Sequence, residues 1–104
     1  MTFADNLKLI PGVDDIEKLE LLDAGGKVVA TLENKPGKAG SLAVYRQLLI
    51  RHQKIDRAAA TAGLTLFAEH TQDAREHPGK HPNIDRLFNV IEDNLTLTGR
   101  LTAK

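Results

Sequence analysis

Hydrophobic and polar residues alternate in two neighbouring stretches near the beginning of the chain. The first covers residues 19–22 and the second covers residues 28–33. The segment between them, residues 23–26, contains two glycines, which favour a tight turn. A period of two on both sides of such a turn predicts a β-hairpin.

A spacing of three to four between hydrophobic residues predicts helices on both sides of this hairpin. Thr2 and Asp5 form a capping-box pattern at the start of a short N-terminal helix, which a Pro-Gly pair ends. After the hairpin, a long amphipathic helix is predicted over residues 41–62. Ser41 is suited to be its N-cap, and Gly63 is suited to follow its last residue.

The second half of the chain predicts two further strands, a loop and a helix. Residues 64–68 are typical of a strand, residues 69–82 show no clear period, and residues 95–101 alternate in the way expected of a strand with one buried face. Asn83 is suited to cap the helix between the loop and the last strand. The apolar face of this helix consists of Ile84, Leu87, Phe88 and Ile91.

This order of elements predicts the fold class. It is a short N-terminal helix, a β-hairpin and then α-β-α-β, within a single domain of 104 residues. We expect an α+β fold, or a small α/β fold, whose helices pack on a four-stranded mixed sheet. If strands 28–33 and 64–68 are parallel and joined by a right-handed crossover, their carboxyl ends lie at one edge of the sheet. In open α/β sheets, ligands bind at that edge.

Composition excludes several classes of chemistry. The absence of cysteine excludes disulfides, thiolate zinc sites and thiol catalysis. Four aromatic residues and a net charge of zero argue against nucleic acid as a partner. Acidic residues are in excess over residues 1–33, and basic residues are in excess over residues 34–57. Two solvated faces or a binding patch would both explain this uneven distribution of charge. Because no signal sequence or membrane-spanning stretch is recognisable, we expect a cytoplasmic protein with no membrane partner.

The candidate chemistry centres on two similar turns. Residues 35–38 and 77–80 both contain Pro-Gly-Lys, and a helix is predicted after each. Free backbone N–H groups at a helix N-terminus, together with a nearby lysine, attract an anion. The first turn does not match the G-x-x-x-x-G-K-[ST] pattern, which argues against nucleotide hydrolysis. The predicted ligand-binding residues are Lys38, Ser41, His77, Lys80 and His81.

A metal site is the alternative for the predicted loop over residues 69–82. Three of the four histidines of the chain, His70, His77 and His81, lie in this loop together with Asp73 and Glu76. Imidazole and carboxylate groups are ligands of zinc and similar ions. The spacing fits no zinc motif, and the prolines and glycine around residues 78–82 prevent a regular helix there.

The sequence His-Pro-Gly-Lys-His-Pro-Asn-Ile-Asp-Arg-Leu over residues 77–87 is similar to a family of small bacterial proteins of unknown function. This resemblance implies a stand-alone bacterial protein and carries no catalytic residue with it. Three functions therefore stay open. The favoured one is a non-enzymatic binding or regulatory module, without a cofactor, for a small anionic (phosphorylated) ligand. The others are a metal-dependent enzyme and a homo-oligomeric, partner-binding or structural protein such as a homodimer.

Overall fold

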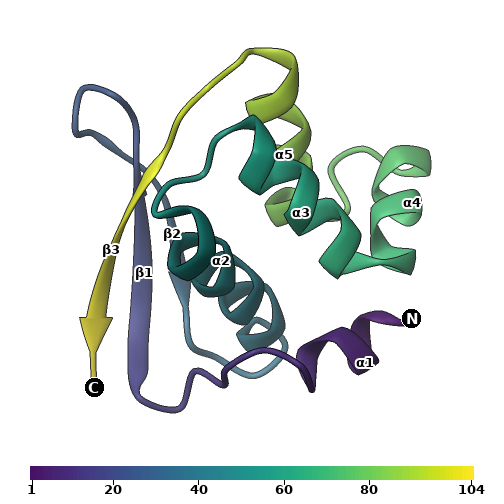
Figure 1. Cartoon of the computed structure of the whole chain (residues 1–104), viewed down its shortest axis with the longest axis horizontal. Coiled ribbons are helices and arrows are strands. Elements are labelled where there is room, and N and C mark those ends of the chain that lie inside the picture. Colours follow the sequence, from purple (N-terminus) through teal and green to yellow (C-terminus); the bar gives the residue numbers. More distant parts are fainter.

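The computed structural model describes residues 1–104 and contains five helices and three strands (Figure 1). In chain order these are α1 (Phe3–Leu7), β1 (Ile16–Leu22), β2 (Val28–Glu33), α2 (Ala39–His52), α3 (Arg57–Phe67), α4 (Glu69–Glu76), α5 (Pro82–Glu92) and β3 (Thr98–Ala103). Helix α2 contacts both β1 and β2 of the sheet and also α3. Figure 1 shows the sheet on one side of the molecule and α3, α4 and α5 on the other.

The three strands form one antiparallel sheet in the order β2-β1-β3. The predicted hairpin is confirmed, with Leu19 opposite Leu32 and Leu21 opposite Ala30. Strand β3 pairs with the other edge of β1, where Leu101 lies opposite Leu19. The predicted four-stranded mixed sheet is wrong, because the sheet has three strands and no parallel pair. The two Pro-Gly-Lys turns therefore do not leave from one edge of a parallel sheet.

Residues 64–68 are predicted to form the fourth strand, but in the structure α3 includes them as far as Phe67. The buried residues of α3 recur at helical spacing: Ala59, Ala60, Gly63 and Phe67. Gly63 lies inside this helix and does not end it. A Cβ atom at Gly63 would lie only 2.8 Å from Leu87 and 2.9 Å from Leu48, so the helices pack closely on its bare Cα. Tertiary contact therefore keeps glycine within a helix despite its low helix propensity.

The long helix expected after the first Pro-Gly-Lys turn is divided into α2 and α3. Helix α2 ends where Gln53 adopts a left-handed conformation with φ of 66°. Ile55 then exchanges two backbone hydrogen bonds with Leu97, at 2.8 and 2.9 Å. Asp56 is the N-cap of α3, and its Oδ1 accepts from the backbone N–H of Ala59 at 2.9 Å. The break between α2 and α3 thus lets Ile55 pair with Leu97, in the segment that leads into β3.

The predicted loop over residues 69–82 contains a helix, α4. Ala68, with φ of 53°, separates α4 from α3. Only Thr71 and Ala74 of α4 are buried, and the Thr71 hydroxyl donates a hydrogen bond to the carbonyl oxygen of Leu64. Because these two buried side chains are small, α4 has no hydrophobic period that sequence analysis could detect.

The last strand also differs from its prediction. Strand β3 begins at Thr98, whereas alternation indicated residues 95–101. Leu97 is buried ahead of the strand, but Leu101 is 47% exposed. The expected buried face is absent: in the edge strand β3 only Thr102 is half-buried, and the other residues are exposed.

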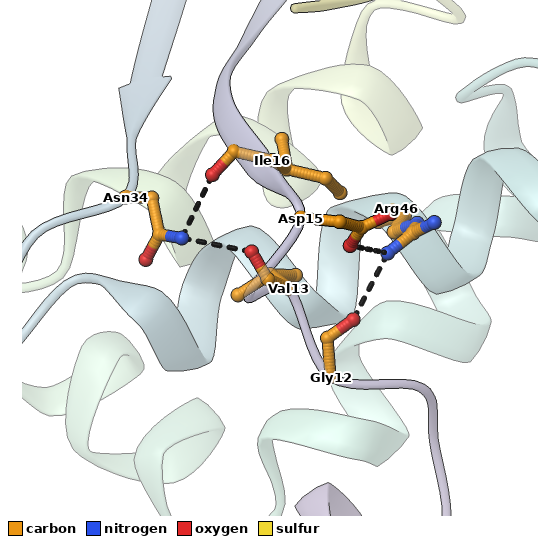
Figure 2. Close-up of polar contacts among 6 residues, drawn as sticks. All are labelled: Gly12, Val13, Asp15, Ile16, Asn34 and Arg46. Atoms are coloured by element: carbon orange, nitrogen blue, oxygen red, sulfur yellow. Dashed lines mark hydrogen bonds and ion pairs between the residues drawn. The ribbon is translucent and has the colours of Figure 1, made fainter. Parts of the chain in front are cut away.

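The segment between α1 and β1 is held by two polar side chains (Figure 2). The Asn34 amide donates to the carbonyl oxygens of Val13 and Ile16, both at 2.8 Å. Arg46 on α2 donates to the carbonyl oxygen of Gly12 at 2.9 Å and pairs with Asp15 at 3.2 Å. These contacts join the basic segment to the acidic one, and they fix the chain that carries α1, whose predicted capping box is confirmed.

Candidate functional site

Both Pro-Gly-Lys turns contribute to one small cavity of about 280 Å³. Its walls also come from α1, from the last residue of α3 and from α4. The lining residues are Phe3, Gly37, Ser41, Phe67, His70, Lys80, His81, Pro82, Asn83 and Ile84. Three of the five predicted ligand-binding residues are among them: Ser41, Lys80 and His81. Lys38 and His77 lie in the same two turns but do not line the cavity.

The start of α2, which follows the first turn, exposes a hydroxyl group to this cavity. Helix α2 begins at Ala39, and its N-cap residue is Lys38, whose side chain makes no capping hydrogen bond. The predicted capping role of Ser41 is therefore wrong. Ser41 is the third residue of the helix, and its hydroxyl forms no hydrogen bond with another group of the chain. A half-buried hydroxyl without a partner is available to a ligand.

The second turn is organised around one carboxylate, that of Asp73 on α4. The Nε2 of His81 lies 2.6 Å from Asp73 Oδ2, and the Nζ of Lys80 lies 2.9 Å from the same oxygen. His77 is more distant, with its Nε2 3.8 Å from Oδ1. The hydrogen bond from His81 and then that from Lys80 lower the pKa of Asp73 to about 2. Asp73 therefore stays ionised and holds the turn against α4.

Another part of the cavity lining is aromatic. The Phe3 ring stacks on Phe67 with centroids 5.4 Å apart, and the rings of Phe3 and His70 pack in a T-shape with centroids 5.1 Å apart. The His70 and His81 rings are 5.6 Å apart. The sequence does not indicate Phe3 and Phe67 as site residues, because they are 64 positions apart and only the docking of α1 on α3 brings them together. No local pattern marks them.

The predicted metal-ligating residues are distributed over two places. The side-chain ligand atoms of Asp73, Glu76 and His77 lie within 4.8 Å of one another on the exposed side of α4. His70 and His81 instead face the cavity. The ammonium group of Lys80 is already bound to Asp73, and its charge opposes a divalent cation at that carboxylate.

The lowered pKa of Asp73 gives a testable pH dependence. Its carboxylate stabilises the fold above the ordinary pKa of an aspartate, and this contribution is lost as the pH falls towards 2. We expect Asp73→Asn to lower the melting temperature at pH 6, and we expect the difference from the unmodified protein to shrink steadily below pH 4. Thermal unfolding followed by circular dichroism, from pH 6 to below pH 4, measures this difference in melting temperature. Asp14→Asn, at an exposed carboxylate without a hydrogen-bond partner, is the control, and a pH-independent difference for Asp73→Asn would contradict the expectation.

Fold and cavity together define a class: a small α+β protein with a three-stranded antiparallel sheet and a polar cavity between two Pro-Gly-Lys turns. Residues 3–101 match the family described as "Uncharacterized protein conserved in bacteria (DUF2322)", and the chain belongs to this family. The resemblance seen over residues 77–87 is thereby confirmed. No curated protein and no solved structure matches the chain. None of its helices combines the length and the apolar character needed to cross a membrane.

Proposed function

We propose that the chain is a non-enzymatic binding or regulatory module, acting in the cytoplasm, that holds a small anionic (phosphorylated) ligand in the 280 Å³ cavity. The observation that carries this proposal is the meeting of the unpartnered Ser41 hydroxyl with Lys80 and His81 from the second turn. Two segments about 40 residues apart supply complementary donors to one small space.

Three further features support an anionic ligand. Helix α5 begins at this cavity, and the N-terminus of a helix of 11 residues carries a partial positive charge. The ammonium group of Lys80 has three N–H donors, and Asp73 takes one of them. Outside the lining, Lys38 would contribute by charge and His77 as a hydrogen-bond donor.

The size and the aromatic lining of the cavity restrict the ligand further. Its volume lies just below the range of about 300–1,000 Å³ that is usual for drug-sized ligands, so the ligand is small. The Phe3–Phe67 stack and the His70 ring add an aromatic surface to the lining that holds Lys80. A phosphate group attached to a small planar body fits both parts of the lining.

Titration with inorganic phosphate and with phenyl phosphate, followed by NMR at constant ionic strength, tests this proposal. We expect saturable shifts at Ser41, His70 and Lys80, with phenyl phosphate bound more tightly. Because charge-assisted hydrogen bonds contribute about 1.5–3 kcal/mol, Lys80→Gln is expected to weaken binding by about tenfold or more. Ser41→Ala should weaken it less, since its hydroxyl is neutral.

Lys27→Gln is the matched control, because it removes an exposed lysine in the hairpin turn. It is expected to leave both dissociation constants unchanged. Absence of a saturable response to either phosphate, or an equal loss in Lys80→Gln and Lys27→Gln, would overturn the proposal.

A metal-dependent enzyme is supported by one observation, the proximity of Asp73, Glu76 and His77. These groups lie outside the cavity, and the bound ammonium of Lys80 opposes a divalent cation there. The anion-binding function agrees better with the position of the hydrogen-bond donors, because Ser41, Lys80 and His81 line the cavity.

A further inference from the structure

The largest cavity of the molecule, about 850 Å³, lies on the other side of α5. It is formed by the turn between β1 and β2, by α5 and by the segment that joins α5 to β3. It adjoins the smaller cavity at Pro82, which lines both. Its volume is within the usual range of about 300–1,000 Å³ for ligand sites, and the proposed phosphate site does not use it.

One side of this cavity carries an arginine that has no acidic partner. The Nη1 of Arg86 donates to the hydroxyl of Tyr45 at 3.2 Å and to Oδ1 of Asn83 at 2.9 Å. The guanidinium group also lies over the Tyr45 ring, 5.6 Å from its centroid, and Tyr45 is fully buried. These contacts hold one end of the guanidinium in place. Its Nε and Nη2 groups make no hydrogen bond with the chain, and together they form the fork that binds a carboxylate through two hydrogen bonds.

Two carboxylates line the same cavity without a cationic partner. Oδ1 of Asp23 accepts from the backbone N–H groups of Gly25 and Lys27, at 3.0 and 2.9 Å. Oδ2 of Asp85 accepts from the backbone N–H of Gly79 at 2.9 Å. Each aspartate keeps its second oxygen free, and neither forms an ion pair. With Arg86 as the only cation of the lining, the wall carries a net negative charge, which disfavours a purely anionic ligand.

The remaining wall offers apolar surface and neutral hydrogen-bonding groups. Leu95 and Val29 have large hydrophobic side chains, yet Leu95 is 41% exposed and Val29 is 48% exposed. The side chains of Asn94 and Thr96 line the cavity and have no hydrogen-bond partner in the chain. A ligand with a short aliphatic body would cover the exposed leucine and valine.

From this arrangement we infer that the cavity is a second ligand site, which takes a small zwitterion of the aliphatic amino-acid class. The carboxylate of the ligand pairs with Arg86, its ammonium group pairs with Asp23, and its aliphatic part contacts Leu95 and Val29. Only a ligand that carries both charges can pair with Arg86 and with an aspartate of the wall at the same time.

The test uses three probes that differ by one group each: L-leucine, 4-methylpentanoate without the ammonium group, and 3-methylbutylamine without the carboxylate. Each is titrated into the full chain and followed by NMR. Saturable shifts are expected with L-leucine at residues 23–26 and 86–97 and not at Ser41 or His70. Both half-probes should bind about tenfold more weakly or worse, because each leaves a charged group of the wall unpaired.

Two variants assign the charges. Arg86→Lys, which loses the fork, is expected to weaken L-leucine binding about tenfold, whereas Arg75→Lys is the control. Arg75 lies outside this cavity and also rests on an aromatic ring, that of Phe88, at 5.2 Å. Asp23→Asn keeps a side-chain acceptor for the hairpin turn but loses the charge, so it should weaken L-leucine and leave 4-methylpentanoate bound as well or better.

Three results would overturn the inference: no saturable shift with L-leucine, equal binding of L-leucine and 3-methylbutylamine, or equal effects of Arg86→Lys and Arg75→Lys. If Arg86→Lys does not fold, because Arg86 also supports Tyr45 and Asn83, the Asp23→Asn comparison decides. The phosphate titration of the smaller cavity is independent of all these outcomes.

Discussion

Replacing Gly63 by valine is expected to lower the free energy of unfolding by about 3 kcal/mol, the upper end of what overpacking a core usually costs. A Cβ atom at Gly63 would lie 2.8 Å from Cδ1 of Leu87 on α5 and 2.9 Å from Cδ1 of Leu48 on α2. Both leucines are buried, with 0% and 1% exposure, so neither can move into solvent. Since interiors are close-packed, the added methyl groups must push the helices apart.

Urea unfolding measures this effect as a lower transition midpoint with an unchanged slope. Ala58→Val is the matched control on the exposed face of the same helix, and it should cost no more than about 0.7 kcal/mol through helix propensity. Gly63→Ala should fall between the two, because alanine regains about 1 kcal/mol of helix propensity while it still meets both leucines. Equal losses for valine at positions 58 and 63 would show that close packing at Gly63 is not what destabilises the variant.

Tyr45→Ala is expected to lower the free energy of unfolding by about 3–5 kcal/mol, as for other large aromatic residues in a core. Tyr45 is fully buried on α2, and its hydroxyl donates to the carbonyl oxygen of Asn83 and accepts from Arg86. Burial raises the pKa of Tyr45 to about 12, so the hydroxyl keeps its proton at neutral pH. It thus connects α2 with the first turn of α5, which separates the two cavities.

Tyr45→Phe distinguishes the ring from the hydroxyl group. It keeps the packing but leaves the Asn83 carbonyl without its donor, so a loss of about 1–2 kcal/mol is expected. Both variants are measured by urea unfolding of the full chain. An unchanged stability of Tyr45→Phe would show that the hydroxyl contacts contribute nothing, and a loss equal to that of Tyr45→Ala would contradict the role of ring packing.

Elements that depend on neighbouring residues were predictable from the sequence. The capping box at Thr2 and Asp5, the hairpin and the amphipathic helix α5 each rest on contacts or patterns within one segment. The prediction for residues 64–68 was wrong, because alternation over five residues cannot distinguish a strand from the end of a buried helix. Helix α4 was missed because its buried residues are the small Thr71 and Ala74.

The candidate site shows the same division. The two Pro-Gly-Lys turns were recognisable, but the expected reason for their meeting, a parallel sheet edge, was wrong. They meet because α5 packs on α3 and α3 on α2, which brings the starts of α2 and α5 to one cavity. The sequence predicts Ser41 as the N-cap of α2, but Lys38 holds that position in the structure. The Ser41 hydroxyl is therefore not used for capping and stays available.

By itself, the sequence determined the α+β class, the hairpin, the family membership and the two cationic turns, because these depend on periodicity, turn residues and motifs along the chain. Only the tertiary structure decided which residues distant in the sequence meet: Phe3 with Phe67, and Arg86 with Tyr45. The physical reason is that helix packing is set by side chains meeting across the whole core. Gly63 therefore allows Leu48 of α2 and Leu87 of α5 to pack closely on α3, although the local pattern predicts that Gly63 ends a helix.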